Sequence, residues 1–155
     1  MNQLSEYRSK LIERLETAVE EFRAACLAVA DPFEPVDEGG WNTHQLAVHT
    51  RDVDQVVYGM RIRRTMEEEN PEFQNFDADE WMAAHYHADE PLASILDELS
   101  ASVKETAAML RALPREAWSR ESTHLTHGGG FTLQTWVERG LAHIEEHLET
   151  VKKAG

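Results

Sequence analysis

Apolar residues recur at steps of three, four and seven in four segments of the chain, which is the spacing of amphipathic helices. No segment alternates with the period of two that a half-buried strand requires. Asn42, Thr43 and Thr132 are suitable N-caps, and Pro91 fits the start of a helix because its missing N–H needs no partner there. The predicted helices run from the first residues to about Ala30, from Asn42 or Thr43 (after a turn at residues 38–40) to before Asn70, from Pro91 to Leu113, and from Leu133 to about Lys152.

Four helices of this kind pack economically as an antiparallel four-helix bundle, in which metal sites lie between facing helices. Residues 71–90 mix aromatic and acidic side chains and are too long and too apolar for a bare loop. They predict a long crossover between the second and third helices that carries one short helix. The expected fold class is therefore all-α, as a single domain over residues 1–155.

The chain is strongly acidic, with 15 Lys and Arg against 29 Asp and Glu and a formal net charge of -14. Such a surface repels a phosphate backbone and an anionic membrane, so we expect neither nucleic acid nor a membrane as a partner. The single cysteine, Cys26, excludes an internal disulfide. A single cysteine also suits a reducing compartment, and the sequence shows no apolar secretion signal or membrane-spanning segment. We therefore expect a cytoplasmic protein. A small-molecule substrate is the expected partner.

Two histidines stand one helical turn apart in the stretch His143-Ile144-Glu145-Glu146-His147. Read as H-x-x-E-H, the stretch matches the inverted zinc-protease signature, in which the glutamate is the general base. At about 100° per residue, however, both histidines fall on the same side as Trp136 and Val151, and Glu146 falls near its edge. The pair is therefore better read as H-x-x-x-H on the buried side, where two imidazoles can hold one metal ion.

A catalytic zinc-type site needs a third protein ligand. In the inverted proteases this ligand is a downstream glutamate, but only LETVKKAG follows His147, and Glu149 falls on the opposite side of the helix. Upstream, His49 interrupts the apolar stripe of the second helix, which reads Leu46, His49, Val53, Val56 and Met60. We therefore predict His49, His143 and His147 as metal ligands. The other histidines are expected elsewhere: His44 on another side of the second helix, and His85, His87, His124 and His127 at the surface or a pocket rim.

The string His127-Gly128-Gly129-Gly130 matches the oxyanion-hole sequence of some lipases and esterases. That chemistry also requires a G-x-S-x-G turn between a strand and a helix, which this sequence does not contain. The three glycines are instead expected to form a flexible approach to the last helix, close to a pocket mouth.

Three segments carry a family resemblance: WNTHQLAVHTRDVD at 41–54, RIRR at 61–64 with Asn70-Pro71 after it, and FTLQTWVERGLAHIEEHL at 131–148. With this spacing the chain resembles the DinB-like superfamily, which includes YfiT-type proteins, bacillithiol and glutathione S-transferase-like enzymes, and mycothiol-dependent maleylpyruvate isomerases. The resemblance implies a four-helix bundle with a long crossover, usually dimeric. It also implies a divalent metal, zinc or nickel, held by His49 and the pair His143 and His147.

Three neutral imidazoles leave a divalent metal with its full charge and an open position, which can lower the pKa of a bound water towards ~7 or hold a thiolate. The first hypothesis is a metal-dependent enzyme that activates a low-molecular-weight thiol for S-transfer to a small electrophile, with hydrolysis by water as the close variant. The alternatives are a non-catalytic, stress-related metal-binding bundle, and a metal-free protein with three hydrogen-bonded histidines.

Five further residues are candidates for this chemistry. Asp52, one turn after His49, and Glu146 are candidates for an accessory acid or base, with surface solvation as the ordinary alternative. Tyr58 and Arg61, together with Arg64, are candidates for contact with an anionic thiol cofactor, with surface ion pairs as the alternative for the arginines. Cys26 is expected in the core, so the thiol would have to come from outside the chain.

Overall fold

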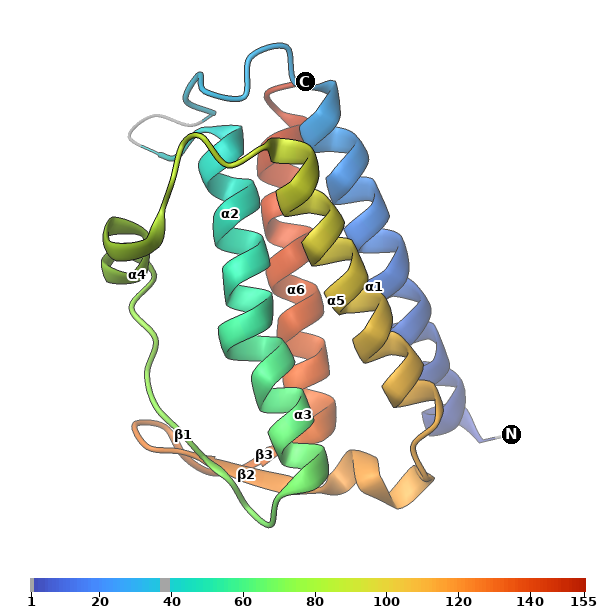
Figure 1. The fold of residues 1–155 in the computed structure, drawn as a ribbon. Coiled ribbons are helices and arrows are strands. Elements are labelled where there is room, and N and C mark those ends of the chain that lie inside the picture. The colour runs from blue at the N-terminus through green and yellow to red at the C-terminus, as the bar shows by residue number, and fades with distance from the viewer. Residues whose placement is uncertain (1, 37–39) are drawn as a thin grey trace.

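The computed structural model describes residues 2–36 and 40–155, and its four long helical columns lie side by side as a bundle (Figure 1). Apart from Gly40, the predicted turn at residues 38–40 lies outside the described residues. The second column is continuous through three parts, α2, a π-helical turn and α3. The elements are α1 (Gln3–Ala28), α2 (Thr43–Val53), η1 (Asp54–Tyr58, the π-helical turn), α3 (Gly59–Glu67), α4 (Ala78–His85), α5 (Leu92–Arg111), η2 (Arg115–Ser119, a 3₁₀ turn) and α6 (Leu133–Lys152).

The helix starts follow the capping residues in the sequence. The side chain of Asn42 accepts the backbone N–H of Gln45, whose own side chain accepts the N–H of Asn42, and this reciprocal pair fixes the start of α2. At α6, the Thr132 hydroxyl accepts the N–H of Thr135 at 3.2 Å. The predicted four long helices are confirmed, and so is the short helix in the crossover, which is α4.

Side-chain contacts between the columns show that the bundle is not antiparallel throughout. Arg8 bonds Gln134 and Arg14 pairs with Glu145, so α1 and α6 run in the same direction. The antiparallel prediction is therefore wrong for this pair. It is also wrong for α2 and α5, which run in parallel, as the pairs Arg51–Glu98 and Asp54–Ser102 show.

The long crossover explains the parallel pair α2 and α5. The chain leaves the end of α3, passes back along the outside of α2 with α4 on the way, and enters α5 at the end of the bundle where α2 began (Figure 1). A connection that returns along the whole bundle makes the helices on either side of it parallel. The crossover itself was predicted; its consequence for direction was not.

Three short strands lie at one end of the bundle (Figure 1), so the all-α prediction is wrong in this part. β2 (Glu121–His124) and β3 (Gly128–Thr132) form an antiparallel hairpin, and β1 (Glu72–Phe73) of the crossover pairs with β2 in parallel. Gly128, Gly129 and Gly130 are the first three residues of β3, and Gly128 and Gly130 have φ of 96° and 83°, which glycine adopts without strain. The predicted flexible approach is thus a strand of the hairpin.

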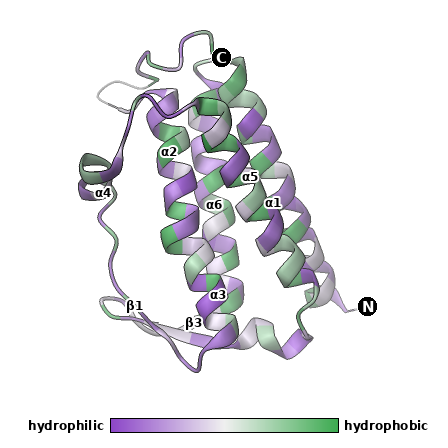
Figure 2. Ribbon diagram, in the orientation of Figure 1, coloured by the Kyte–Doolittle hydropathy of each residue, from purple (hydrophilic) through white to green (hydrophobic). Residues whose placement is uncertain are grey.

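The core fills the space between the four columns. Green apolar and purple polar residues alternate along the long helices in Figure 2, as expected when one side of each helix is buried. Cys26 is fully buried within this core, as predicted, and burial raises the pKa of its thiol to about 12. Across residues 2–36 and 40–155, no helix combines the length and apolar character that crossing a membrane demands.

The π-helical turn changes which residues of the second column face inward. A π turn bonds residue i to i+5, so it adds one residue to the helix and rotates the residues after it by about 100°. The predicted stripe places Val56 and Met60 inside, but both are only half-buried, whereas Val57 and Arg61, one position later in each case, are buried. The extra residue therefore buries Arg61 more deeply than Met60, which still packs against the edge of the core.

Candidate metal centre

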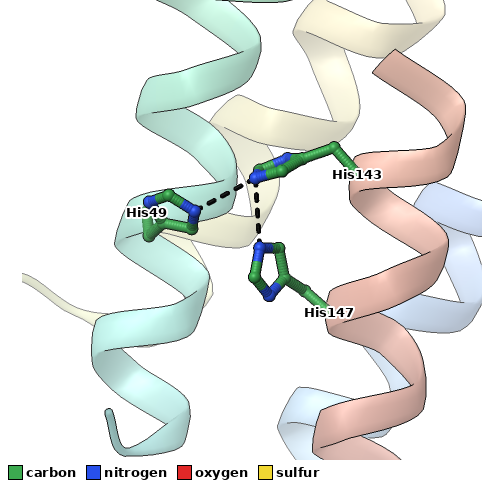
Figure 3. Close-up of side chains that lie close together, drawn as sticks. All are labelled: His49, His143 and His147. Carbon is green, nitrogen blue, oxygen red and sulfur yellow. Dashed lines mark hydrogen bonds between the residues drawn. The ribbon is translucent and has the colours of Figure 1, made fainter. Parts of the chain in front are cut away.

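The three predicted metal ligands come together between α2 and α6 (Figure 3). His49 points from α2 towards His143 and His147, which lie one turn apart on α6. The Nε2 atom of His143 lies 3.0 Å from the Nε2 atom of His49 and 3.0 Å from that of His147. One nitrogen from each ring can be chosen so that all three lie within 4.8 Å of one another.

The surroundings keep these imidazoles neutral. Burial, and to a smaller degree the neighbouring His147, lowers the pKa of His49 from 6.5 to about 4. Burial and then the two other rings lower the pKa of His143 to about 3. The pKa of His147 is also lowered, mainly by burial, although Glu146 opposes the shift. Neutral imidazole is the form that binds a metal ion.

The donor set fits a metal ion better than a set of hydrogen bonds. In a neutral imidazole one Nε2 atom offers either one N–H or one lone pair. The Nε2 atom of His143 has two close nitrogen contacts, which is more than one such atom can satisfy well. Tetrahedral zinc with ~2.0–2.1 Å bonds to nitrogen would set the nitrogens about 3.3 Å apart. Two of the three separations are close to that value and the third lies within 4.8 Å, so the three histidines can converge on a zinc-type ion.

A cavity of about 270 Å³ adjoins the cluster, with His49 and His143 in its lining. Its other walls come from the end of α2, from η1 and α3, from the crossover, from the β2–β3 hairpin and from the first half of α6. The described residues that line it include two arginines and two further histidines, and no aspartate or glutamate. The open side of the histidine cluster therefore faces a small, cationic space.

The two carboxylates proposed as an accessory acid or base do not line this cavity. Asp52 is buried, but its oxygens accept Arg51 Nε at 2.9 Å and Trp81 Nε1 at 3.0 Å, which ties α4 to α2. Glu146 is exposed on α6. These positions give Asp52 a structural contact and Glu146 a surface one.

Of the three candidates for contact with a thiol cofactor, two line the cavity and one does not. Tyr58 and Arg61 both line the cavity, and the Tyr58 ring lies 5.6 Å from that of His143. Gly140 makes this packing possible, because a Cβ at that position would lie only 3.2 Å from the Cβ of Tyr58. Arg64 instead pairs with Glu68 one turn along its own helix.

The remaining histidines have other roles. His44 is buried, with its ring nitrogens 2.6 Å from the Tyr86 hydroxyl and 2.6 Å from the Glu90 carbonyl, so it fastens the crossover to α2. His85 and His87 are exposed. His124 and His127 line the cavity, as the pocket-rim expectation allowed.

Two contributors to the site were not predicted. Trp41 packs its ring 4.8 Å from that of His49, and Arg139 lines the cavity. The signal for Arg139 is its position one i, i+4 step before His143, which places both on neighbouring turns of one helix face. Trp41 precedes α2 and carries no periodic signal.

Comparison with known proteins agrees with this architecture. The family model of the DinB superfamily matches residues 3–151. The chain belongs to the DinB superfamily. Among solved structures, this DinB protein is similar to YfiT from Bacillus subtilis, described as "a probable metal-dependent hydrolase with an unusual four-helix bundle topology". The two share 21% sequence identity and a TM-score of 0.86, over 99% of this chain and 87% of YfiT. No curated protein matches this member of the superfamily.

Proposed function

We propose that this protein is a divalent-metal-dependent hydrolase of small molecules, with His49, His143 and His147 as the metal ligands. The observation that carries the proposal is the convergence of three imidazole nitrogens at the wall of a cavity. A purely structural metal site is usually closed by four protein ligands, whereas three ligands beside a cavity leave a position for water or substrate. The description of YfiT as a probable metal-dependent hydrolase supports the same reaction class.

The lining of the cavity also supports metal dependence. Hydrolysis needs a nucleophile that is deprotonated near neutral pH, and side-chain carboxylates often serve as its base. Among the described residues that line the cavity there is no such carboxylate. When bound by three imidazoles, a zinc-type ion supplies this function by lowering the pKa of its water ligand towards ~7. The remaining lining residues are available to orient the substrate and exclude bulk water.

Thiol transfer is a second candidate function. The two arginines in the cavity wall favour an anionic co-substrate, and low-molecular-weight thiols such as glutathione carry carboxylates. Cys26 is buried in the core with its pKa raised to about 12, so the nucleophilic thiol would come from solution. The same three ligands would serve both reactions.

The test begins with protein purified without a nickel column. Bound metal is measured by elemental analysis, and the metal-free protein is titrated with zinc, nickel and manganese. Each loaded form is assayed against small ester, amide and halide substrates, with and without added thiols. His49→Ala is compared with His87→Ala, which removes an exposed histidine of the crossover.

We expect tight binding of at least one metal, and turnover that depends on it and is lost in His49→Ala but kept in His87→Ala. Turnover without thiol supports hydrolysis, and turnover only with thiol supports transfer. Absence of metal affinity, or equal rates in the two variants, would overturn the proposal. Bound metal without turnover would favour the non-catalytic bundle.

A further inference from the structure

The cavity beside the histidine cluster has the opposite charge to the protein as a whole. The chain carries a formal net charge of -14, yet the described residues that line the cavity include Arg61 and Arg139 and no carboxylate. A concave site with one sign of charge attracts ligands of the opposite sign, even when the remaining surface repels them. The contrast points to an anionic ligand.

Arg61 is a buried cation whose hydrogen bonds are incompletely satisfied. Its side chain is only 7% exposed, and it has no carboxylate partner among the described residues. One Nη donates to the Gln74 carbonyl at 2.8 Å, and the Nε is buried without a partner. By contrast Arg51, the other buried arginine of this column, pairs with Asp52 and Glu90. An unpaired buried charge is costly, so its retention facing a cavity fits a ligand that completes the pair.

Arg139 brings a second guanidinium to the aromatic side chains that line the cavity. The Arg61 guanidinium carbon lies 4.7 Å from the centroid of Trp136, and that of Arg139 lies 5.9 Å from it and 5.2 Å from Phe131. The Phe131 and Trp136 rings are stacked, with centroids 4.9 Å apart. Arg139 is exposed and, like Arg61, has no carboxylate partner in the described chain. Both guanidinium groups therefore lie against Trp136 in the wall of one cavity.

His124 adds a neutral donor to the group. Its Nδ1 accepts the backbone N–H groups of Thr126 at 3.1 Å and His127 at 3.2 Å, which fixes the proton of the neutral ring on Nε2. The ring is buried and lines the cavity. It can therefore donate a hydrogen bond without adding a third charge.

We propose that Arg61, Arg139 and His124 form an oxyanion subsite that binds a carboxylate or phosphate group of the substrate. Guanidinium groups suit this task because they donate two parallel hydrogen bonds to such oxyanions. The cavity, of about 270 Å³, has room for such a group of a small metabolite. As a statement about substrate class, the inference rests on the proposed function; as a binding site, it does not need the metal.

The experiment measures anion binding to the metal-free protein, so that no anion can bind through a metal ion. Inorganic phosphate and malonate are titrated calorimetrically at constant ionic strength, with chloride as the reference anion. The variants are Arg61→Gln, Arg139→Gln and the control Arg14→Gln, an arginine of α1 that pairs with Glu145 and does not line the cavity. Arg139 is exposed, so its variant tests the subsite even if Arg61→Gln fails to fold.

We expect saturable binding of phosphate or malonate, and the preferred anion identifies the phosphate or carboxylate class. The affinity should fall at least about tenfold in Arg139→Gln and Arg61→Gln, which each lose charged hydrogen bonds, and stay unchanged in Arg14→Gln. No saturable binding, or equal affinity in Arg139→Gln and the wild type, would overturn the subsite. Zinc titration of the same preparations tests the metal site separately, so either proposal can fail alone.

Discussion

The contact of α1 with α5 and the contact of α2 and α3 with α6 are built from different chemistry. Between α1 and α5 most of the buried side chains are apolar, and the buried Ser100 hydroxyl donates to Glu20 at 2.8 Å. The charged pairs Glu16–Arg111 and Glu20–Lys104 lie at the solvated margin. Between α2 and α6 the protein buries His49 and brings two more histidines towards it. The first interface has the residues of an ordinary stabilising core. The second places polar groups where apolar ones would stabilise the bundle more, which is typical of a functional site.

A core truncation on the α1 side should have the largest effect on stability. Phe22 has no exposed surface, so Phe22→Ala is expected to lower the free energy of unfolding by about 3–5 kcal/mol, by loss of contacts and creation of a cavity. Zinc affinity of the folded fraction should not change. Urea denaturation and calorimetric zinc titration measure the two quantities, and a large loss of zinc affinity would contradict the division between the interfaces.

Metal removal should have the next largest effect, through the other interface. At a free zinc concentration of 100 times Kd, binding to the folded state adds about 2.7 kcal/mol, or about 5–10 °C in Tm for a chain of this size. Thermal melts with zinc and with excess chelator measure the difference. His143→Ala should abolish it and His87→Ala should retain it; a zinc shift that survives in His143→Ala would place the ion elsewhere.

The π-helical turn lies between His49, a proposed metal ligand, and Arg61, a residue of the proposed anion subsite. A Cβ at Gly59 would lie 2.5 Å from the Asp54 carbonyl oxygen, so Gly59→Ala must distort the turn. We expect a loss of about 1–3 kcal/mol in stability, as in other overpacked sites. Because Arg61 follows the turn and His49 precedes it, anion affinity should fall more than zinc affinity. Met60→Ala, a half-buried neighbour in the same helix, is the control. Equal losses of zinc and anion affinity would show that the turn does not separate the two groups.

The histidine cluster should make the metal-free protein sensitive to acid. His49 and His143 have folded-state pKa values of about 4 and about 3, against 6.5 for the unfolded chain. Below pH 6.5 the unfolded state takes up protons that the folded state does not, so stability falls with a slope approaching about 1.4 kcal/mol per pH unit for each histidine. Denaturation midpoints at pH 7 and pH 5 should therefore differ less in His143→Gln than in the wild type.

The control for this pH dependence is His87→Gln, which replaces an exposed histidine and should keep the wild-type slope. Other groups titrate in the same range, and burial raises the pKa of Asp54 to about 6. That shift has the opposite sign, because an ionised buried carboxylate destabilises the fold as pH rises. The contribution of the histidine cluster is therefore the difference in the pH dependence of stability between His143→Gln and His87→Gln. Identical slopes in the two variants would show that burial does not lower the pKa of His143.

The smallest effect is expected at the outer side of α6. Arg14 and Glu145 form an ion pair in which both side chains are substantially exposed, 55% and 39% respectively. Such pairs contribute about 0–1 kcal/mol, so Arg14→Gln should change the denaturation midpoint little and zinc affinity not at all. A loss comparable to that of Phe22→Ala would show that the surface pairs, and not the apolar core, hold the α1 side together.

The positions of the three histidines were predictable because each interrupts an apolar stripe. His143 and His147 are one turn apart on α6, and His49 sits between Leu46 and Val53 on α2, so helical geometry alone placed them inward. The stripe then failed at Val56 and Met60, because the π-helical turn adds a residue without an obvious local signal. Gly59 is needed at this turn because a Cβ there would meet the Asp54 carbonyl oxygen, but that contact is known only from the structure.

The three strands were not predicted because they also lack a local sequence pattern. β1 contains two residues and pairs with β2 from a distant part of the chain, and β3 begins with three glycines. Neither is long enough or apolar enough to show an alternating pattern. The pairing of β1 with β2 depends on the path of the crossover in space. The periodicity of the sequence does not predict that path. The sequence placed His124 at the surface or a pocket rim, but its hydrogen bonds within the hairpin are known only from the structure.

The parallel packing of α1 against α6 has a consequence for how the chain is made. The bond between Arg8 and Gln134 joins residues 126 positions apart, so it forms only after the two intervening helical columns have been synthesised. At about 5–20 residues per second, translation delays this contact by on the order of ten seconds. During that time the apolar face of α1 has no α6 to cover it. We therefore expect the nascent chain on the ribosome to expose that face to solvent until α6 emerges.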